Sequence, residues 1–291
     1  MKLSVETWVI QDAVGYENAI RMIAEAGFDC CDMSFFGETV ERDLLGEDYL
    51  QKAETLRRWM NEAGISCNQA HAPFTFSRED VLGETNPRWV LTARAIRSAA
   101  LLGADQIIVH AVGDERDRDF TEFNLDFYRS FAPVCADAGI RVAVENLFIR
   151  DTKRRCIVGR LGTPEKLMAF MKQLDPRYFT ACVDLGHAAI TGQEPEEFLA
   201  GMDGDVLGAL HVHDNNYLDD CHWLPWIGDF HWDEIVKTLA RIGYRGDMTL
   251  EALNYFVRYD AAMLPRALKF AEVTGRELIK RFEQACRSEL A

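Results

Sequence analysis

Hydrophobic and polar positions along the chain repeat as a helical segment, a glycine and a short apolar segment. The glycines are Gly27, Gly64, Gly103 and Gly139, which lie 37, 39 and 36 residues apart, and Gly243 repeats the pattern later. Helical periodicity precedes each glycine and an apolar strand follows it, which is typical of a glycine that ends a helix before a buried parallel strand. The pattern predicts a repeating βα unit.

Strands and helices alternate along the whole chain. We expect strands near residues 3–8, 28–34, 65–71, 105–111, 140–146, 179–184, 206–212 and 247–252, and helices near 16–26, 48–63, 86–102, 121–138, 163–173, 195–202, 232–242 and 261–284. This predicts an α/β fold, a single (β/α)8 TIM barrel occupying residues 1–291 as one domain. A doubly wound sheet is the competing fold, but residues 6–9 are not the glycine-rich turn of a nucleotide-binding sheet.

Chemically active side chains lie at the predicted strand ends. In a TIM barrel these ends meet at one face, where active sites are built. The residues at the eight ends are Trp8, Asp32, His71, His110, Glu145, Asp184, His211 and Glu251. From the third strand to the eighth, each end carries a group that can bind a metal ion or move a proton. We therefore expect one site assembled from several strands.

Residues 210–222 concentrate imidazoles and carboxylates directly after an apolar strand. Such side chains are costly to bury unless they bind something. Together, Glu145, Asp184, His211 and Glu251 form an oxygen-rich set with one nitrogen, which suits one divalent ion, Mn²⁺ first and otherwise Mg²⁺, Co²⁺ or Zn²⁺. Three carboxylates against a dication leave a net charge of about −1, so we expect the metal-free site to be less stable.

Composition narrows the class of protein. The chain is 48% hydrophobic and 27% charged, as in ordinary globular proteins. Its eight cysteines include no Cys-x-x-Cys pair, which argues against a zinc–thiolate centre or a disulfide framework. The net charge of −15 argues against a nucleic-acid partner, because phosphate binding needs clustered Lys and Arg. Residues 153–155 are a local basic exception, either a solvated loop or an anion contact beside the site.

The start of the chain bears on location. The first ten residues lack the basic head and continuous apolar core of a signal peptide. No run approaches the roughly eighteen apolar residues of a membrane span. We therefore expect a cytoplasmic protein with no membrane partner.

Short phrases at the predicted strand ends resemble the sugar phosphate isomerase/epimerase family of xylose isomerase-like barrels. They are residues 71–73 (His-Ala-Pro), 108–110 (Ile-Val-His), 144–146 (Val-Glu-Asn), 183–187 (Val-Asp-Leu-Gly-His), 211–214 (His-Val-His-Asp), 225–228 (Pro-Trp-Ile-Gly), 243–246 (Gly-Tyr-Arg-Gly) and 250–251 (Leu-Glu). The resemblance covers nearly the whole chain and rests on the order and spacing of these phrases. Members of the superfamily include ketose 3-epimerases, hydroxypyruvate isomerases, inosose dehydratases and endonuclease IV nucleases.

The resemblance implies roles for individual residues. Glu145, Asp184, His211 and Glu251 would hold the metal ion, and Glu145 and Glu251 would also exchange protons with substrate carbon from opposite faces. A hydrogen beside a ketone is a weak acid, and a metal ion on the neighbouring oxygens stabilises the enediolate. A positioned carboxylate base adds roughly 10²–10⁴-fold to the rate. The implied substrate contacts are His187, His71, His110, Trp8 and His222, whereas His213 and His231 are interpreted as structural.

Two departures from the pattern leave the activity open. Some ketose 3-epimerases place an arginine six residues after the metal-binding histidine, where this chain has Tyr217, so that substrate contact is missing or comes from elsewhere. Conversely, one set of residues matches positions that complete a three-metal cluster in endonuclease IV. These residues are Asp220, His222, His71, His110 and His187.

We therefore expect a metal-dependent isomerase or epimerase of a small sugar, sugar phosphate or keto acid. One alternative is a dehydratase or lyase of a polyol or keto-sugar with the same metal site. A less favoured one is an endonuclease IV-like phosphodiesterase, against which the net charge weighs, as does the lack of basic residues in 35–40. Barrels of this family are often homodimers or homotetramers. Loops 74–86, 148–161 and 215–230 would shape the pocket, so the substrate is not predicted.

Overall fold

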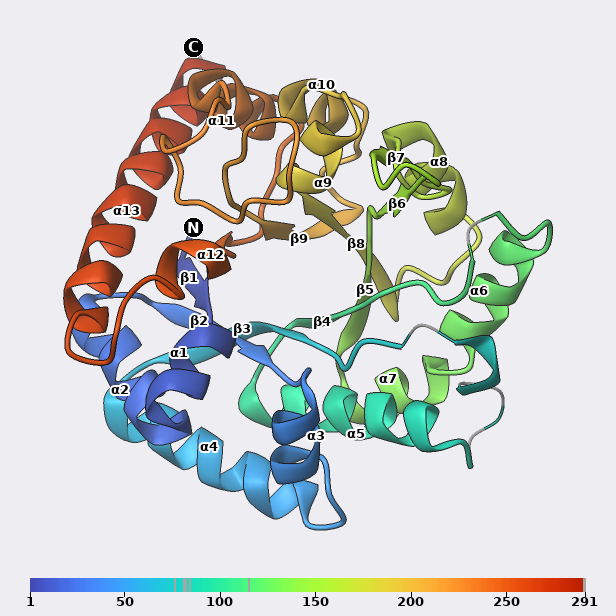
Figure 1. Cartoon of the computed structure of the whole chain (residues 1–291), viewed down its shortest axis with the longest axis horizontal. Helices are drawn as coiled ribbons and strands as arrows, with labels where there is room; N and C mark the ends of the chain where they lie inside the picture. Colours follow the sequence, from blue (N-terminus) through green and yellow to red (C-terminus); the bar gives the residue numbers. More distant parts are fainter. Residues whose placement is uncertain (76, 81–82, 84, 115, 290–291) are drawn as a thin grey trace.

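Buried strands surround the centre of the molecule and helices form an outer ring (Figure 1). The computed structural model describes residues 1–75, 77–80, 83, 85–114 and 116–289. The central strands are β1 (Leu3–Glu6), β2 (Cys30–Ser34), β3 (Ser66–His71), β4 (Gln106–Val109), β5 (Arg141–Glu145), β8 (Phe179–Asp184), β9 (Leu207–His211) and β10 (Met248–Leu250). They form one sheet in the order β10-β1-β2-β3-β4-β5-β8-β9, with parallel neighbours.

The barrel closes between β9 and β10 through a short contact just beyond their ends. Val212 and Leu250 form an isolated parallel bridge. The Val212 N–H donates to the Thr249 carbonyl at 2.8 Å, and the Glu251 N–H donates to the Val212 carbonyl at 3.1 Å. Across the described residues, eight parallel strands therefore make a nearly closed barrel, which confirms the predicted (β/α)8 TIM barrel.

Most predicted helices are present with similar bounds. They are α2 (Tyr16–Ala26), α4 (Tyr49–Ala63), α5 (Pro87–Leu102), α8 (Pro164–Met171), α10 (Pro195–Ala200), α11 (Trp232–Arg241) and α13 (Leu264–Glu289). Gly27, Gly64 and Gly103 follow α2, α4 and α5 with φ of 104°, 72° and 92°. This left-handed conformation carries little cost only in glycine, so the repeated glycines end the helices as the sequence indicated.

The single helix predicted over 121–138 is wrong. The structure has two helices there, α6 (Phe120–Arg129) and α7 (Ala132–Ala138). Pro133 lies in the first turn of α7. Proline has no N–H to donate and its ring clashes with the preceding turn, so it is tolerated at the start of a helix but not in the middle of one.

Several short elements after the strands were not predicted. They are α1 (Trp8–Val14), α3 (Glu38–Leu44), η1 (Arg78–Asp80), β6 (Phe148–Arg150), β7 (Cys156–Val158), α9 (Leu185–Ile190) and α12 (Leu253–Phe256). Trp8 was expected to end the first strand but begins α1. The reason is local, because the buried Glu6 ends β1 and its Oε1 accepts the Trp8 N–H at 2.8 Å, which turns the chain away from the sheet. The expected loop 74–86 lies partly outside the described residues.

The interior of the barrel places the site. Ile108, Ala143, Cys182 and Ala209 form a separate buried cluster. Alternate residues of a strand share a face, so the residues two positions further along β5, β8 and β9 point to the same interior. Those residues are Glu145, Asp184 and His211, which therefore rise directly above this small apolar layer. Within the described ranges, no helix is both long enough and apolar enough to cross a membrane.

Candidate metal centre and active site

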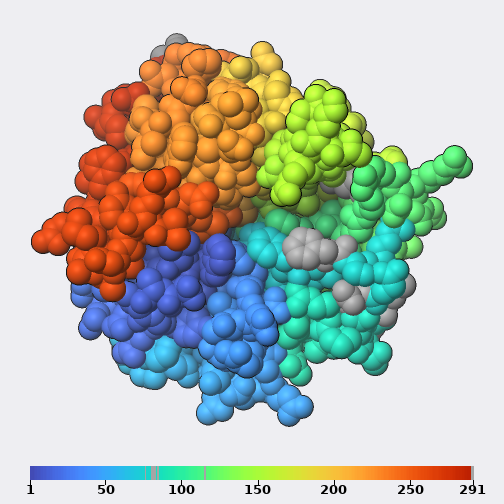
Figure 2. All heavy atoms as spheres, viewed as in Figure 1, coloured from blue at the N-terminus to red at the C-terminus, as the bar shows by residue number. Residues whose placement is uncertain are grey.

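A cavity of about 450 Å³ opens at the carboxyl ends of the strands. Its base contains Glu145 and Glu251, and its walls include His71, His110 and His187. The β6–β7 hairpin and the segment after β9 border the same mouth, coloured yellow-green and orange in the space-filling view (Figure 2). The structure thus brings the strand-end residues from separate parts of the chain into one hollow.

The four residues of the predicted metal set lie close together, and two of them, Glu145 and Glu251, line this cavity. His211 Nδ1 lies 3.0 Å from Glu145 Oε1, 3.4 Å from Glu251 Oε2 and 3.8 Å from Asp184 Oδ2. All four side chains are buried. Three buried carboxylates around one imidazole repel each other unless a cation lies among them, so the donor set fits a divalent ion.

The electrostatics of His211 support this fit. Burial alone would lower the pKa of His211, but neighbouring acidic groups, including the Glu251 and Glu145 carboxylates, raise it well above its ordinary value. The side chains therefore favour a positive charge at this point. On the other side of the ring, Nε2 faces Asp32 Oδ2 at 3.7 Å. A carboxylate behind the ring is the arrangement that orients metal-binding histidines.

The two glutamates of the set differ electrostatically. Burial would raise the pKa of Glu145, but His211 and His110 lower it well below its ordinary value. Burial raises the pKa of Glu251 to about 8, and the positive charges of His211 and His222 offset this only in part. Without a metal ion, the surroundings of Glu145 thus favour the carboxylate and those of Glu251 favour the acid.

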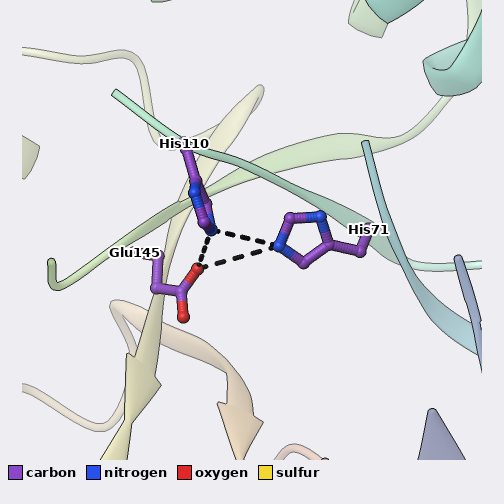
Figure 3. A group of neighbouring side chains, drawn as sticks. All are labelled: His71, His110 and Glu145. Carbon is purple, nitrogen blue, oxygen red and sulfur yellow. Dashed lines mark hydrogen bonds and ion pairs between the residues drawn. The ribbon is translucent and has the colours of Figure 1, made fainter. Parts of the chain in front are cut away.

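A second cluster lies beside the first, made of His71, His110 and Glu145 (Figure 3). His110 Nε2 lies 2.7 Å from Glu145 Oε2 and 3.1 Å from His71 Nε2. Burial and, after it, the neighbouring His110 lower the pKa of His71 to about 3. His71 is therefore a neutral imidazole. Because its Nδ1 donates to the Ala72 carbonyl at 2.9 Å, the lone pair on Nε2 faces the other two side chains.

The rings of His187 and His222 are held in the same way as that of His71, by a hydrogen bond from Nδ1 to a backbone carbonyl. The Nδ1 of His187 donates to the Asn146 carbonyl at 2.9 Å, and the Nδ1 of His222 donates to the Glu251 carbonyl at 2.9 Å. Their Nε2 atoms face Asp220 Oδ2 at 3.7 Å and 3.2 Å. A ring fixed through one nitrogen by a carbonyl presents the other nitrogen to a metal ion or substrate.

The sequence analysis interpreted His213 as structural but did not link it to Asp184. This ring is fully buried, and its Nε2 lies 3.0 Å from both carboxylate oxygens of Asp184. It also stacks on His222, with ring centroids 4.1 Å apart. Gly186 makes room for it, since a Cβ there would lie 2.0 Å from the His213 Cε1. The paired occurrence of a glycine after Asp184 and a second histidine after His211 was the available signal.

Other expected residues lie as follows. Trp8 lines the cavity mouth, and its ring is 5.1 Å from that of Phe36. His231 is outside the site, with its Nδ1 3.1 Å from Glu196. Glu6 was not predicted to belong to the site but ends β1 beneath it, and burial raises its pKa well above the ordinary value. Glu6 could have been predicted as a site residue only if the first strand had been predicted to end at residue 6.

The sequence of this chain matches a known protein family. Residues 20–271 match the model of the xylose isomerase-like TIM barrel family. This match spans most of the 291 residues, and the chain belongs to that family.

Individual relatives are more distant. An uncharacterized protein of Methanocaldococcus jannaschii is 28% identical over 195 residues, 63% of this chain and 64% of that protein. A D-psicose 3-epimerase of Ruminiclostridium cellulolyticum is 24% identical over 254 residues, 84% of this chain and 80% of that enzyme. The structure of a D-tagatose 3-epimerase-like protein superimposes with a TM-score of 0.74 at 22% identity, covering 100% of both chains. Structures of sugar epimerases, such as a D-psicose 3-epimerase with D-tagatose, are also among the structural neighbours.

Proposed function

We propose that this protein is a metal-dependent epimerase or isomerase of a small ketose or related keto compound. The observation that carries the proposal is the convergence of Glu145, Asp184, His211 and Glu251 around His211 Nδ1. The similarity to a D-psicose 3-epimerase adds support from sequence. We expect one divalent ion, Mn²⁺ first, held by these four side chains.

The chemistry begins with the removal of a proton from carbon beside a carbonyl. A divalent ion bound at the four side chains supplies positive charge that stabilises the negative oxygen formed by this loss. Glu145 and Glu251 project from β5 and from the end of β10, so they approach a bound substrate from different directions. One carboxylate removes the proton and the other returns one, to the opposite face for epimerisation or to the neighbouring carbon for isomerisation.

The cavity walls position the substrate. His187 has its Nδ1 fixed by the Asn146 carbonyl, and its Nε2, 3.7 Å from Asp220 Oδ2, would contact a substrate oxygen. His71, His110 and His222 offer ring nitrogens around the same hollow. Trp8 provides a flat apolar surface at the mouth against which a sugar can stack. Holding the substrate in one orientation lowers the entropic cost of the proton transfers.

Solvent exchange tests the proposal directly. Mn²⁺-loaded protein should incorporate deuterium from D₂O into a ketose at the carbon beside the carbonyl, without net loss of water. Glu251→Gln should lower this rate by about 10²-fold or more, because an amide cannot carry the proton. His231→Gln, outside the site, should exchange at the wild-type rate. An equal rate in Glu251→Gln and wild type would reject the proposal.

A second candidate function is a multi-metal phosphodiesterase, favoured by the paired clusters around Glu145 and Asp220. Metal content distinguishes the two. About one ion per chain, lost in Glu145→Gln and kept in His71→Ala, supports the epimerase or isomerase. Three zinc ions, with one lost in His71→Ala and salt-sensitive DNA binding, would favour the phosphodiesterase. A dehydratase, which would form a conjugated product absorbing in the ultraviolet, stays a prediction, as do the homo-oligomer and the cytoplasmic location.

A further inference from the structure

The hairpin of β6 and β7 carries a cluster of cations at the rim of the cavity. Arg150, Lys153, Arg154 and Arg155 lie within six residues, in a chain with a net charge of −15. The first strand of the hairpin, β6, reaches the site, because its residues 148 and 149 line the cavity. The basic segment that the sequence analysis left as a solvated loop or an anion contact therefore stands beside the metal centre.

Arg150 is on the face of the hairpin that is turned to the site. It shares that face with Phe148, whose ring centroid lies 5.0 Å from that of His187. The Arg150 guanidinium lies over the Phe148 ring, 5.4 Å from its centroid. Its cross-strand neighbour is Cys156. Burial raises the pKa of the Cys156 thiol, and Arg150 and Asp220 are among the charged groups near enough to shift it.

Arg150 is held in place by the backbone and has no carboxylate partner among the described residues. Its Nη1 donates to the Arg154 carbonyl at 3.1 Å, and Arg154 adopts the left-handed conformation with φ of 62°. Asp151, the one acidic residue of 148–158, is paired with Arg155 at 2.6 Å. Within the part of the chain that the structure describes, no carboxylate lies within 4.0 Å of the Arg150 guanidinium.

Histidines apart, the described lining of the cavity has no cationic side chain, and Arg150 lies at its rim, next to the lining residues 148 and 149. None of its described lining residues is Lys or Arg, and the residues outside the described ranges include neither type. Tyr217 occupies the position at which some ketose 3-epimerases have an arginine, but its hydroxyl donates to Glu194 Oε2 at 2.6 Å. A negatively charged substrate group above the metal centre would thus find its counter-charge at Arg150.

We propose that Arg150 binds an anionic group, a carboxylate or a phosphate, at the end of the substrate remote from the reacting carbon. The substrate class is then acidic or phosphorylated ketoses rather than neutral ones, and this step rests on the proposed function. A guanidinium binds both groups through paired hydrogen bonds. The neighbouring cations of the hairpin draw such an anion to the mouth of an otherwise acidic protein.

Three ketoses that differ only at C6 test the proposal, namely D-fructose, D-fructose 6-phosphate and D-fructuronate. Calorimetric titration of the Mn²⁺-loaded protein should show one charged ketose binding at least about 10-fold more tightly than D-fructose. The charged ketose that binds more tightly shows whether Arg150 prefers a phosphate or a carboxylate. Arg150→Gln should remove this preference and leave D-fructose binding unchanged. Lys153→Gln makes the same charge change on the same hairpin and should alter each affinity by about threefold at most.

Several results would overturn the proposal. These are equal affinity for all three ketoses, equal losses in Arg150→Gln and Lys153→Gln, and no measurable binding of either charged ketose. Deuterium exchange on the same compounds separates this inference from the proposed function. Binding of a charged ketose through Arg150 without exchange would reject the function and keep the anion site. Exchange of D-fructose with no preference for a charged ketose would reject the anion site and keep the function.

Discussion

His213 shows how one buried side chain can orient a proposed metal ligand, Asp184. It reaches both oxygens of Asp184 and stacks on His222, so it fixes the direction of that carboxylate. We expect His213→Ala to weaken Mn²⁺ binding about 10- to 100-fold, the usual effect of losing a group that orients a ligand. Calorimetric titration of chelator-treated protein with Mn²⁺ would measure this.

A second variant tests the same contact from the other side. Gly186→Ala would place a methyl group against the His213 ring and should also weaken Mn²⁺ binding. His231→Ala removes a histidine from the surface and is the control. Unchanged Mn²⁺ affinity in both His213→Ala and Gly186→Ala would show that Asp184 needs no such support.

Glu6 should give the metal-free protein a pH dependence of stability. Its pKa in the folded state is raised by burial, so the unfolded state releases the proton first as pH rises. The stability that the protonated side chain contributes is complete below the unfolded pKa of about 4.3 and is lost as pH rises toward the folded pKa, by at most about 1.4 kcal/mol per pH unit. Urea unfolding between about pH 5 and 8 should show a flatter pH dependence in Glu6→Gln. Parallel profiles would contradict this assignment.

From the sequence, the strand-end residues that the structure brings together were easier to predict than the side chains and carbonyls that hold them in place. The strand ends supplied Glu145, Asp184, His211 and Glu251, because inward positions two residues apart follow from strand geometry. The hydrogen bonds of the ring nitrogens of His71, His187 and His222 could not be predicted from the sequence. They are made to backbone carbonyls of other loops, which only the folded chain brings near.

At the scale of elements, the repeated helix-ending glycines can be tested separately from packing. A Cβ on Gly103 would meet no heavy atom within 4 Å, so a substitution there probes the backbone alone. With φ of 92°, Gly103→Ala should lower the free energy of unfolding by about 1–2 kcal/mol. Gly103→Asn should cost less, because asparagine tolerates the left-handed conformation. Urea unfolding measures both, and an equal loss in the two variants would point to a cause other than φ.

The elements that were missed are those with little hydrophobic periodicity. The helices α1, α9 and α12 are short and follow directly on strands, so their apolar residues continue the pattern of the strand. The β6–β7 hairpin has only three residues per strand, too few for an alternating pattern to stand out. Long helices such as α11 were predicted well, because Trp232, Ile235 and Leu239 recur on one buried face.

At the scale of the whole molecule, metal binding at the proposed centre should stabilise the fold. An ion that binds only the folded chain stabilises it by about 2.7 kcal/mol when present at 100 times its Kd. Thermal unfolding of the protein with Mn²⁺ should therefore occur several degrees higher than with a chelator. Asp184→Asn should lose most of this difference, and His231→Ala should keep it. An equal Tm with and without Mn²⁺ would show that the four side chains do not hold an ion tightly.

The short contact that closes the barrel indicates which part of the fold metal binding would stabilise. Among the described residues, the strand pairing between β9 and β10 is the isolated Val212–Leu250 bridge, and the residues next to it are His211 and Glu251. An ion bound by both of these side chains would stabilise the contact between β9 and β10, where the barrel closes through few hydrogen bonds. In a cell that runs short of the metal, we expect the barrel of the metal-free protein to open more often and proteases to cut it. Metal supply would then set the abundance of the protein as well as its activity.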